Sequence, residues 1–370
     1  MKEAADKPSR APTLSVVVPT YREAANVAVL FERLKATLED LPWEMIVVDD
    51  DSPDETYDVA FGIAATDSRM RCLRRVNRSG LAGAVIEGWL SSSADFVAVI
   101  DGDLQHDETI LPLMYAALAK GAGNIAIGTR ISSAGGLSAA RQTLSGLGAW
   151  FFRRISGVDV RDPMSGFFMI RRDIVGGLAP RLVTDGFKIL VDVILSARGR
   201  LRIVEAPYEF RSRVAGESKL SALVGLDFLG LVVHHATGGI LPIRFVLFAL
   251  VGGIGLIVHL FVLSIFRFWG PEGFGEGQLV ATVVAMASNF VLNNEITYRR
   301  YRFRGAPLIF GFLAFAIACS AGVLANIDIA SALYRSYQRW WLAGLAGALL
   351  SVVWNYVIST NFIWRPRRRR

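Results

Sequence analysis

Two aspartates, Asp101 and Asp103, are separated by one residue and directly follow the short apolar run at residues 96–100. Carboxylates placed in this way at a strand end can hold a hard divalent cation such as Mg²⁺ or Mn²⁺, because these ions prefer oxygen ligands and bridge to phosphate oxygens. Such an ion would neutralise charge on a departing nucleoside diphosphate. The same pattern also occurs in solvated surface turns. The apolar run before it, and Gln105 and His106 after it, favour the metal site.

Acidic and aromatic residues follow two other apolar runs. The acids at 49–51 end the run at 45–48, where they can accept hydrogen bonds from a base or from ribose hydroxyls. Residues 19–23 follow the run at 14–18 and offer a tyrosine ring and a carboxylate. Both segments also fit helix starts, one through a proline near the first turn and the other through a capping box. Ligand binding and helix capping therefore both stay open here.

Several basic residues stand where they could contact a phosphate. A phosphate monoester has a second pKa of about 6, so near neutral pH it is already an anionic nucleophile that needs arginines to position it. An acceptor hydroxyl would need a catalytic carboxylate instead. Asp185 is the best candidate for that carboxylate, although a helix N-cap is the favoured interpretation of this residue. The cations available for a phosphate acceptor are Arg130, Arg141, Arg211, Arg213 and Lys219.

The spacing of apolar runs predicts the elements that position these residues. Runs at 14–18, 45–48, 96–100 and 125–128 read as strands, and helix-like stretches such as 25–39 and 109–120 lie between them. Strands that alternate with helices predict an α/β domain with a largely parallel sheet covered on both faces. Functional groups in such sheets gather beyond the carboxyl ends of the strands.

The remainder of the chain is apolar enough to cross a membrane. Hydrophobic residues make up 52% of the chain, and most of the excess lies after Leu241. Each apolar stretch reaches the roughly 20 residues that a bilayer crossing takes. The connector at 299–304 and the tail at 365–370 are strongly basic, and an even number of crossings puts both on one side, as the positive-inside bias requires. We predict four transmembrane helices, at about 241–268, 278–297, 307–329 and 341–363.

Composition narrows the class of protein further. The formal charge is +7, but no basic helix is interleaved with aromatics, so nucleic acid is not the expected partner. Cys72 and Cys319 fall in different domains, which suits a reducing cytosol. The stretch at 218–235 is amphipathic and would lie on the membrane surface or pack on the soluble domain. Polar residues in the apolar stretches could serve lipid head-group contact or transport, or could form interhelical hydrogen bonds, and both interpretations stay open. These residues are Asn289, Asn293, Asn294, Glu295, His259 and Asn355. No internal repeat is evident.

Taken in chain order, the motifs resemble the polyprenyl-phosphate hexosyltransferases of glycosyltransferase family 2, above all the dolichol-phosphate mannose synthases. The resemblance covers roughly residues 13–235. The segment from 244 to 362 resembles the GtrA-like four-helix membrane domain that is often fused to such enzymes. The matching motifs are Pro19-Thr20-Tyr21-x-Glu23, Val48-Asp49-Asp50-x-Ser52-Pro53-Asp54, Asp101-x-Asp103-Leu104-Gln105-His106, Gly128-Thr129-Arg130 and Gly216-Glu217-Ser218-Lys219.

The resemblance implies a GT-A (Rossmann-like) fold and a role for each matching residue. The metal ligands would be Asp101, Asp103 and Gln105, and the catalytic residues Asp103, Arg130 and Arg141. Contacts to the acceptor phosphate would come from Arg130, Arg141, Arg211 and Arg213. The nucleotide-sugar would be bound by Pro19, Tyr21, Glu23, Val48, Asp50, Asp101, Gly102, Asp103, Gln105, Arg130, Arg213 and Lys219.

The implied reaction is an inverting, Mg²⁺- or Mn²⁺-dependent transfer of mannose from GDP-mannose to polyprenyl or dolichyl phosphate. It would take place at the cytosolic face of the cell membrane, with both termini cytoplasmic. The expected segments are a flexible tail at 1–12, the GT-A domain at 13–216, an interface-helix region at 217–240, the transmembrane domain at 241–364 and a basic tail at 365–370.

Some positions depart from the family pattern, and other functions remain as alternatives. Arg22 stands where asparagine is common, Glu55 where glycine is common, Asp192 where glutamate is frequent, and Phe168 where some members carry a basic residue. UDP-glucose, UDP-galactose or UDP-N-acetylglucosamine could replace GDP-mannose as donor. A processive synthase would need a Gln-x-x-Arg-Trp signature, which is absent. A lipid-linked-sugar transporter or scaffold would not need intact motifs.

Overall fold

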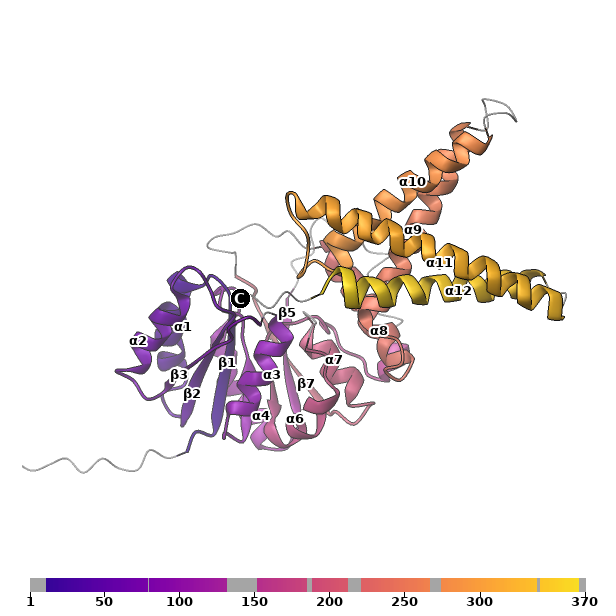
Figure 1. Ribbon diagram of the computed structural model, residues 1–370. Helices are drawn as coiled ribbons and strands as arrows, with labels where there is room; N and C mark the ends of the chain where they lie inside the picture. Colours follow the sequence, from indigo (N-terminus) through magenta and orange to yellow (C-terminus); the bar gives the residue numbers. More distant parts are fainter. Residues whose placement is uncertain are drawn as a thin grey trace, which may run out of the picture. The chain divides into compact units, whose positions relative to one another are not determined.

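The chain folds into two compact units, Met1–Ala236 and Thr237–Arg370. The computed structural model describes residues 11–78, 80–131, 152–184, 188–211, 221–266, 274–337 and 340–365. The first unit is an α/β domain and the second is helical (Figure 1). The predicted fold class, an α/β domain followed by a helical membrane domain, is confirmed.

The described part of the first unit is built on one seven-stranded sheet of order β3-β2-β1-β4-β6-β5-β7. Strand β6 runs antiparallel to β4 and β5, whereas the other pairings are parallel. All four runs that the sequence predicted as strands lie at β1, β2, β4 and β5. The strands are β1 (Leu14–Thr20), β2 (Trp43–Asp49), β3 (Met70–Arg74), β4 (Phe96–Val99), β5 (Ile125–Arg130), β6 (Phe168–Arg171) and β7 (Ile203–Tyr208).

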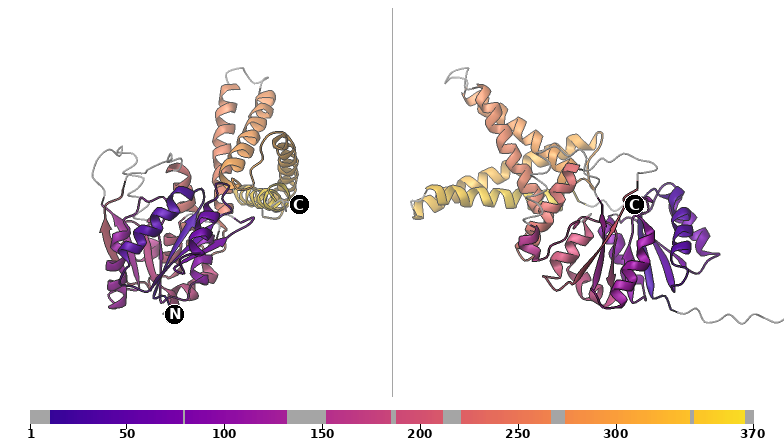
Figure 2. Two further views of the ribbon diagram at one scale, coloured as in Figure 1. Left: turned by 90° about the vertical axis from the view of Figure 1, so that its left-hand side faces the viewer. Right: turned by 180° about the vertical axis from the view of Figure 1, so that it is seen from behind.

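Helices cover both faces of this sheet (Figure 2). Successive side chains of a strand point to opposite faces, so Val16 packs in the core with α1, α2 and α4, while Val17 faces Gly88 of α3. Burial on both faces explains why the strands read as unbroken apolar runs. The helices are α1 (Ala24–Thr37), α2 (Thr56–Ala64), α3 (Leu81–Ser91), η1 (Glu108–Ile110), α4 (Leu111–Ala119), α6 (Arg172–Leu178), η2 (Ala179–Arg181), α7 (Ile189–Ser196) and α8 (Ser221–Ala236).

The strand order places the functional segments at one edge. The chain runs outward from β1 to β2 and β3, and then returns to place β4 on the other side of β1. A crevice at such a switch point, beyond the carboxyl ends of the strands, is the usual ligand site in open α/β sheets. Residues 19–23 leave β1 at this edge, and Asp101 follows β4 at the same edge.

Helix α8 belongs to the first unit and packs on α7. Leu231 and Val232 are buried, and Nε2 of His235 lies 2.7 Å from Oδ1 of Asp192, which is itself buried. The same carboxylate accepts a hydrogen bond from the backbone N–H of Val183 at 2.6 Å. Of the two arrangements expected for the stretch at 218–235, the structure has the helix packed on the soluble domain. Asp192 of α7 therefore links this helix to α8 through His235.

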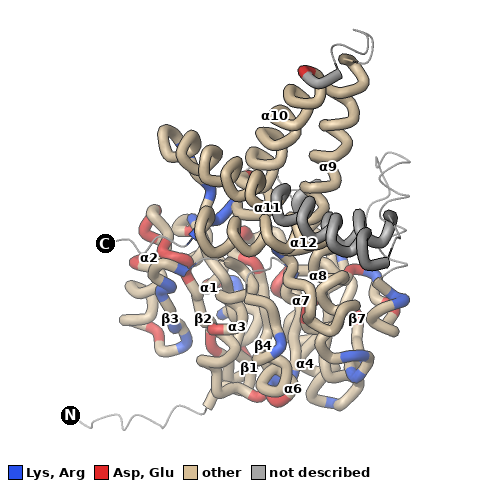
Figure 3. The backbone as a smooth tube through the Cα atoms, turned by 45° about the vertical axis from the view of Figure 1, so that its right-hand side comes forward, with Lys and Arg blue, Asp and Glu red and all other residues tan. Residues whose placement is uncertain are grey.

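The described residues of the second unit form two helical hairpins, α9 (Ile243–Phe266) with α10 (Phe274–Leu292), and α11 (Pro307–Tyr337) with α12 (Trp340–Ile358). Among the side chains described, Ile243–Phe266 and Glu276–Thr297 are long and apolar enough to cross a bilayer. Pro307–Gly322 and Leu349–Ile363 are shorter apolar segments. Few charged residues interrupt α9, α10 or α11 (Figure 3).

The two hairpins share one construction, although the sequence shows no internal repeat. Helix α10 continues into the π-helical turn η5 (Asn293–Thr297), and α12 continues into a matching turn, η6 (Ser359–Ile363). The N–H of Tyr298 donates to the Asn293 carbonyl at 2.8 Å, and the N–H of Trp364 donates to the Ser359 carbonyl at 2.9 Å. The Tyr298 and Trp364 rings stack on each other, with centroids 4.4 Å apart and planes 6° apart.

Each hairpin also packs an asparagine against a glycine. Asn289 of α10 lies against Gly255 of α9, and Asn355 of α12 lies against Gly322 of α11, so a Cβ at either glycine would overlap the amide. Asn289 and Asn355 occupy the same place relative to η5 and η6. Equivalent positions of the two hairpins carry residues of similar size or polarity but of different type, such as Asn293 and Ser359, or Tyr298 and Trp364. The sequence therefore hides the repeat.

Asn294 forms hydrogen bonds with residues beyond its own helical turn. Oδ1 of Asn294 accepts hydrogen bonds from the N–H of Phe303 at 2.8 Å and from Nε1 of Trp364 at 3.1 Å. Its Nδ2 donates to the carbonyl of Phe303 at 3.3 Å and to Oε1 of Glu295 at 3.2 Å. Both ends of the amide are satisfied, which favours a structural role for Asn294.

Candidate active site

The loop that follows β4 carries Asp101, Asp103 and Gln105 at the carboxyl edge of the sheet. A Cβ at Gly102 would lie 3.4 Å from a methyl carbon of Thr20 and 3.5 Å from Cγ of Glu23. The loop therefore lies against the segment that leaves β1, and two motifs that are far apart in the sequence meet. The structure brings these predicted residues together.

Leu104 shapes the loop by adopting a left-handed backbone. Its φ is 62°, which is unusual for a bulky residue and costs roughly 1–3 kcal/mol. Its side chain is 8% exposed within the core, and burying a leucine contributes roughly 1.5–3 kcal/mol. The buried side chain offsets the strain and anchors the turn between Asp103 and Gln105.

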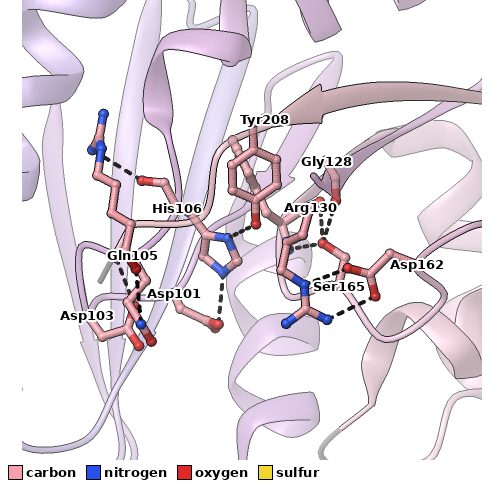
Figure 4. A network of polar contacts seen from close by, with 11 residues as sticks. Asp101, Asp103, Gln105, His106, Gly128, Arg130, Asp162, Ser165 and Tyr208 are labelled. Atoms are coloured by element: carbon pink, nitrogen blue, oxygen red, sulfur yellow. Dashed lines mark hydrogen bonds and ion pairs between the residues drawn. The ribbon is translucent and has the colours of Figure 1, made fainter. Parts of the chain in front are cut away.

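Asp101 is held from two sides. Its Oδ2 lies 3.1 Å from Nε2 of His106, and a Cβ at position 166 would lie 2.6 Å from the same oxygen. Glycine at 166 thus lets the backbone approach the carboxylate closely. His106 also lies 2.6 Å from the hydroxyl of Tyr208, as the close view shows (Figure 4).

Asp103 and Gln105 complete the oxygen donors of this loop. Oδ1 of Asp103 accepts a hydrogen bond from the N–H of Gln105 at 3.2 Å, and Nε2 of Gln105 donates to the carbonyl of Arg211 at 3.3 Å. That second bond uses the amide nitrogen, so the amide oxygen is the atom that a cation would meet.

The donor set fits a cation shared with a phosphate rather than one enclosed by protein. Within the described ranges, no group of three His, Cys, Asp or Glu side chains is placed to hold a metal ion. Mg²⁺ is commonly held by one or two carboxylates together with substrate phosphates. Asp101, Asp103 and the amide of Gln105 match that chemistry.

The predicted nucleoside contacts differ in how accessible they are. Tyr21 is 55% exposed, with the Arg22 guanidinium 5.5 Å from its ring centre, and Oε2 of Glu23 accepts a hydrogen bond from Asn26 at 2.6 Å. Pro19 and Val48 pair in neighbouring strands. The Val48 side chain is fully buried beneath α3, so only its backbone is placed to meet a ligand.

Asp50 forms a buried ion pair that the sequence did not reveal. Its carboxylate accepts hydrogen bonds from Nη1 of Arg75 and, at 2.6 Å, from the N–H of Gly80. Burial raises the pKa of Asp50, although Gly80 and Arg75 act in the opposite direction. Arg75 is 6% exposed and follows β3 directly. The sequence feature that could have indicated this ion pair is the position of Arg75, a charged residue directly after a strand.

Arg130 is held by a partner that the sequence analysis missed. Its Nε and Nη2 donate to Asp162 at 2.7 and 3.1 Å, and this pairing raises the pKa of Arg130. The guanidinium also lies 5.4 Å from the ring centre of Phe210. Ser165 donates to the carbonyl of Gly128 at 2.7 Å and so fixes the loop that carries Asp162. These contacts fix the guanidinium plane and leave Nη1 for a ligand.

Arg211 contacts two carboxylates of the loop that follows β4. Its Nη1 donates to Glu108 at 2.7 Å and its Nη2 to Asp107 at 2.8 Å. Its backbone N–H donates to the carbonyl of Gln105 at 3.0 Å. The Glu108 bond raises the pKa of Arg211. The expected role in acceptor binding stays a prediction. The geometry favours a structural role, in which Arg211 holds the segment with Asp107 and Glu108 in place.

Other predicted positions lie elsewhere. Phe168 is fully buried and packs edge-on against Trp89, so it belongs to the core. Arg22 and Glu55 have φ of 64° and 67°, where the asparagine and glycine of the family pattern would be less strained. Arg141, Asp185, Arg213 and Lys219 lie outside the described residues.

Both halves of the chain match known families. Residues 15–178 match glycosyl transferase family 2, and residues 247–364 match the GtrA/DPMS transmembrane domain. A dolichol-phosphate mannosyltransferase of Pyrococcus furiosus is 32% identical over 357 residues, which are 95% of this chain and 99% of that relative. The chain belongs to the family of the dolichol-phosphate mannosyltransferases.

Further comparisons agree with this assignment. The dolichol-phosphate mannosyltransferase of Saccharomyces cerevisiae is 31% identical to the transferase over 227 residues, 58% of this chain and 84% of the yeast protein. A crystal structure of glucosyl-3-phosphoglycerate synthase from Mycobacterium tuberculosis matches with a TM-score of 0.50 at 17% identity, covering 61% of the transferase and 80% of that chain. That likeness is one of fold. The transferase is a glycosyltransferase with a membrane domain.

Proposed function

We propose that the transferase moves mannose from GDP-mannose to the phosphate of dolichyl or another polyprenyl phosphate, with inversion at the anomeric carbon. One observation carries this proposal: the loop of Asp101 and Asp103 lies at the same sheet edge as Arg130 and the segment with Tyr21. The relatives named for dolichol phosphate and mannose support the choice of substrates. The edge offers oxygen ligands for a metal diphosphate and a fixed cation for a phosphate.

The chain's residues would divide the work between two phosphates. Asp101, Asp103 and Gln105 would hold Mg²⁺ or Mn²⁺, which when bound supplies positive charge to the leaving diphosphate. Arg130 would use Nη1 to orient the acceptor phosphate, with Asp162 fixing the guanidinium plane. A phosphate acceptor carries its own negative charge and needs no general base. A single in-line displacement then follows, which inverts the configuration.

The helical unit supports a cytosolic site. Each hairpin begins and ends on the same side, so Arg244 near the start of α9 and the arginines at 299–304 after η5 share one end. Arg244 lies 5.4 Å from the ring centre of Tyr301 in this connector. Positive charge favours the cytoplasmic side of a membrane. We place that end, and with it the catalytic domain, in the cytosol.

The direct test offers the full-length protein a panel of donors. Membranes that contain it are incubated with polyprenyl phosphate and labelled GDP-mannose, UDP-glucose, UDP-galactose or UDP-N-acetylglucosamine, with and without a chelator. We expect label from GDP-mannose alone to reach the lipid, and chelation to abolish the transfer. Label from a UDP-sugar instead would replace the proposed donor.

The metal role has its own variant. Asp103→Asn should abolish transfer because it removes a carboxylate from the proposed cation site. Asp95→Asn is the matched control, since Asp95 is exposed just before the other end of β4. Full activity in Asp103→Asn would remove this carboxylate from the mechanism. Activity that resists chelation would remove the metal.

A further inference from the structure

His106 is a buried histidine with a partner at each ring nitrogen. Nδ1 lies 2.6 Å from the hydroxyl oxygen of Tyr208, and Nε2 lies 3.1 Å from Oδ2 of Asp101. The residue is 4% exposed, and the rings of Phe167 and Phe210 pack beside it. Figure 4 shows the imidazole lying between β7 and the loop that follows β4. The ring therefore links these two elements in a largely dry environment.

The two partners determine which nitrogen of the neutral imidazole carries the proton. Burial raises the pKa of Tyr208, so its hydroxyl keeps a proton to donate. An ionised carboxylate, by contrast, can only accept hydrogen bonds. One arrangement satisfies both contacts: Tyr208 donates to Nδ1, and the N–H at Nε2 donates to Asp101. The hydrogen bond on one ring nitrogen sets the state of the other.

This arrangement also orients the Asp101 carboxylate. The His106 bond involves Oδ2, and a Cβ at position 166 would lie nearer to this oxygen, at 2.6 Å, than to Oδ1, at 3.2 Å. With that oxygen engaged, Oδ1 is the atom that a cation would approach. Groups that orient a metal ligand without touching the metal commonly change metal affinity by roughly 10- to 100-fold when they are removed.

We propose that His106 is a positioning residue, which holds Asp101 in the orientation for a divalent cation while Tyr208 fixes its tautomer. The proposal rests on the metal role of Asp101 in the proposed function. It adds a connection from β7 to the metal ligand, made by two side chains that do not themselves bind the cation. Tyr208 and His106 act through Asp101.

The test uses the full-length protein in detergent micelles and removes a single oxygen. Tyr208→Phe keeps the ring that packs on Phe167 and His106 but removes the donor to Nδ1. Tyr115→Phe is the matched control, because Tyr115 packs on Phe96 away from the loop. Two quantities are measured: the Mn²⁺ dissociation constant in the presence of GDP, and the ¹⁵N spectrum of histidine side chains in metal-free protein. With four histidines in the chain, His106→Gln assigns the His106 signals.

We expect the wild-type signal to show a protonated Nε2 and a bare Nδ1, and Tyr208→Phe to shift it towards a mixture of tautomers. The Mn²⁺ dissociation constant should rise on the order of 10-fold in Tyr208→Phe and stay unchanged in Tyr115→Phe. His106→Gln keeps a donor near Asp101, so it should bind Mn²⁺ better than His106→Leu. In the His106→Leu background, Tyr208→Phe should add nothing further.

The failing outcomes separate this inference from the proposed function. If the wild type binds Mn²⁺ and Tyr208→Phe binds it equally well with the same tautomer, the positioning role is wrong while the metal role stands. If the wild type with GDP binds no Mn²⁺, the metal role fails and the positioning role fails with it. His106→Leu that binds Mn²⁺ like the wild type also overturns the inference, and its melting temperature reports whether it has folded.

Discussion

Two charged groups of the candidate site, Arg130 and Asp50, are each held by a second group of opposite charge. Asp162 grips Arg130 through two nitrogens, and Arg75 with the Gly80 N–H grips Asp50. Charges fixed before a ligand arrives need little reorganisation on binding, and they act more strongly where water is scarce. Asp162 and Arg75, the less exposed members of these pairs, are therefore as important to the site as Arg130 and Asp50.

Removing Arg75 should expose this dependence on pH. Arg75→Met leaves Asp50 buried without its cation, which should lower the free energy of unfolding by about 3–5 kcal/mol near pH 7. Asp50 already has a folded pKa above 3.8 because of its burial, and losing Arg75 raises it further. The cost is present above the folded pKa and disappears as pH falls through it. The deficit relative to wild type should thus shrink as the pH falls towards the folded pKa of Asp50.

The neighbouring arginine provides the control for this measurement. Arg74→Met removes a partly exposed pair with Asp51 at 2.7 Å, and surface pairs contribute about 1 kcal/mol or less. Thermal unfolding followed by tryptophan fluorescence compares the two variants. Equal losses for both arginines, or a loss in Arg75→Met that does not change with pH, would contradict the account of Asp50.

At the scale of elements, the segment that follows β7 and the loop that follows β4 behave as one unit. Arg211 joins Asp107 and Glu108, its carbonyl accepts from Gln105, and Tyr208 reaches His106. The loop with the proposed metal ligands is thus held by a strand that is not the neighbour of β4 in the sheet. A change at the end of β7 should be felt at Asp101 and Asp103.

Substitution of Arg211 distinguishes a structural role from a role in binding the acceptor phosphate. Arg211→Lys keeps the charge but cannot span Asp107 and Glu108 with a planar fork. We expect it to weaken Mn²⁺–GDP binding about 10-fold while leaving the KM for polyprenyl phosphate near its wild-type value. Arg161→Lys is the control, because Arg161 is 82% exposed. A raised KM for the lipid with unchanged Mn²⁺–GDP binding would restore the acceptor role.

At the scale of the whole molecule, each unit has a core of its own, and that of the second unit centres on the join between its hairpins. Trp364 stacks on Tyr298, contacts Phe290 and Phe315, and donates to Asn294. Phe290 and Phe315 come from α10 and α11, Asn294 lies in η5, and Tyr298 and Trp364 directly follow η5 and η6. One indole therefore ties together both copies of the repeated hairpin.

Replacing that indole should destabilise the helical unit. Trp364→Leu loses the ring stack and the donor to Asn294, and large-to-small changes of a buried aromatic cost about 3 kcal/mol or more. Trp354→Leu is the control, since Trp354 is 41% exposed. The measurement is thermal unfolding in detergent. A smaller loss at 364 than at 354 would show that the stack does not hold the hairpins together.

How far the sequence could predict this structure depended on whether a feature was local. Strands β1, β2, β4 and β5 were predictable because burial on both faces makes each an unbroken apolar run. Asp101 and Asp103 were predictable because they follow such a run. Asp162, Arg75 and Tyr208 were not, since their partners depend on the strand order and on the antiparallel insertion of β6. The repeated hairpin was hidden because matching positions differ in residue type.

The left-handed residues at the sheet edge have a consequence for protein engineering. Glu55 is exposed and has a φ of 67°, a conformation that costs an L-residue about 1–2 kcal/mol. Glu55→Gly, the residue of the family pattern, should therefore raise the melting temperature by about 2–4 °C, with activity retained because Glu55 lies outside the predicted ligand contacts. A single substitution beside the candidate active site should thus make the chain more resistant to heat.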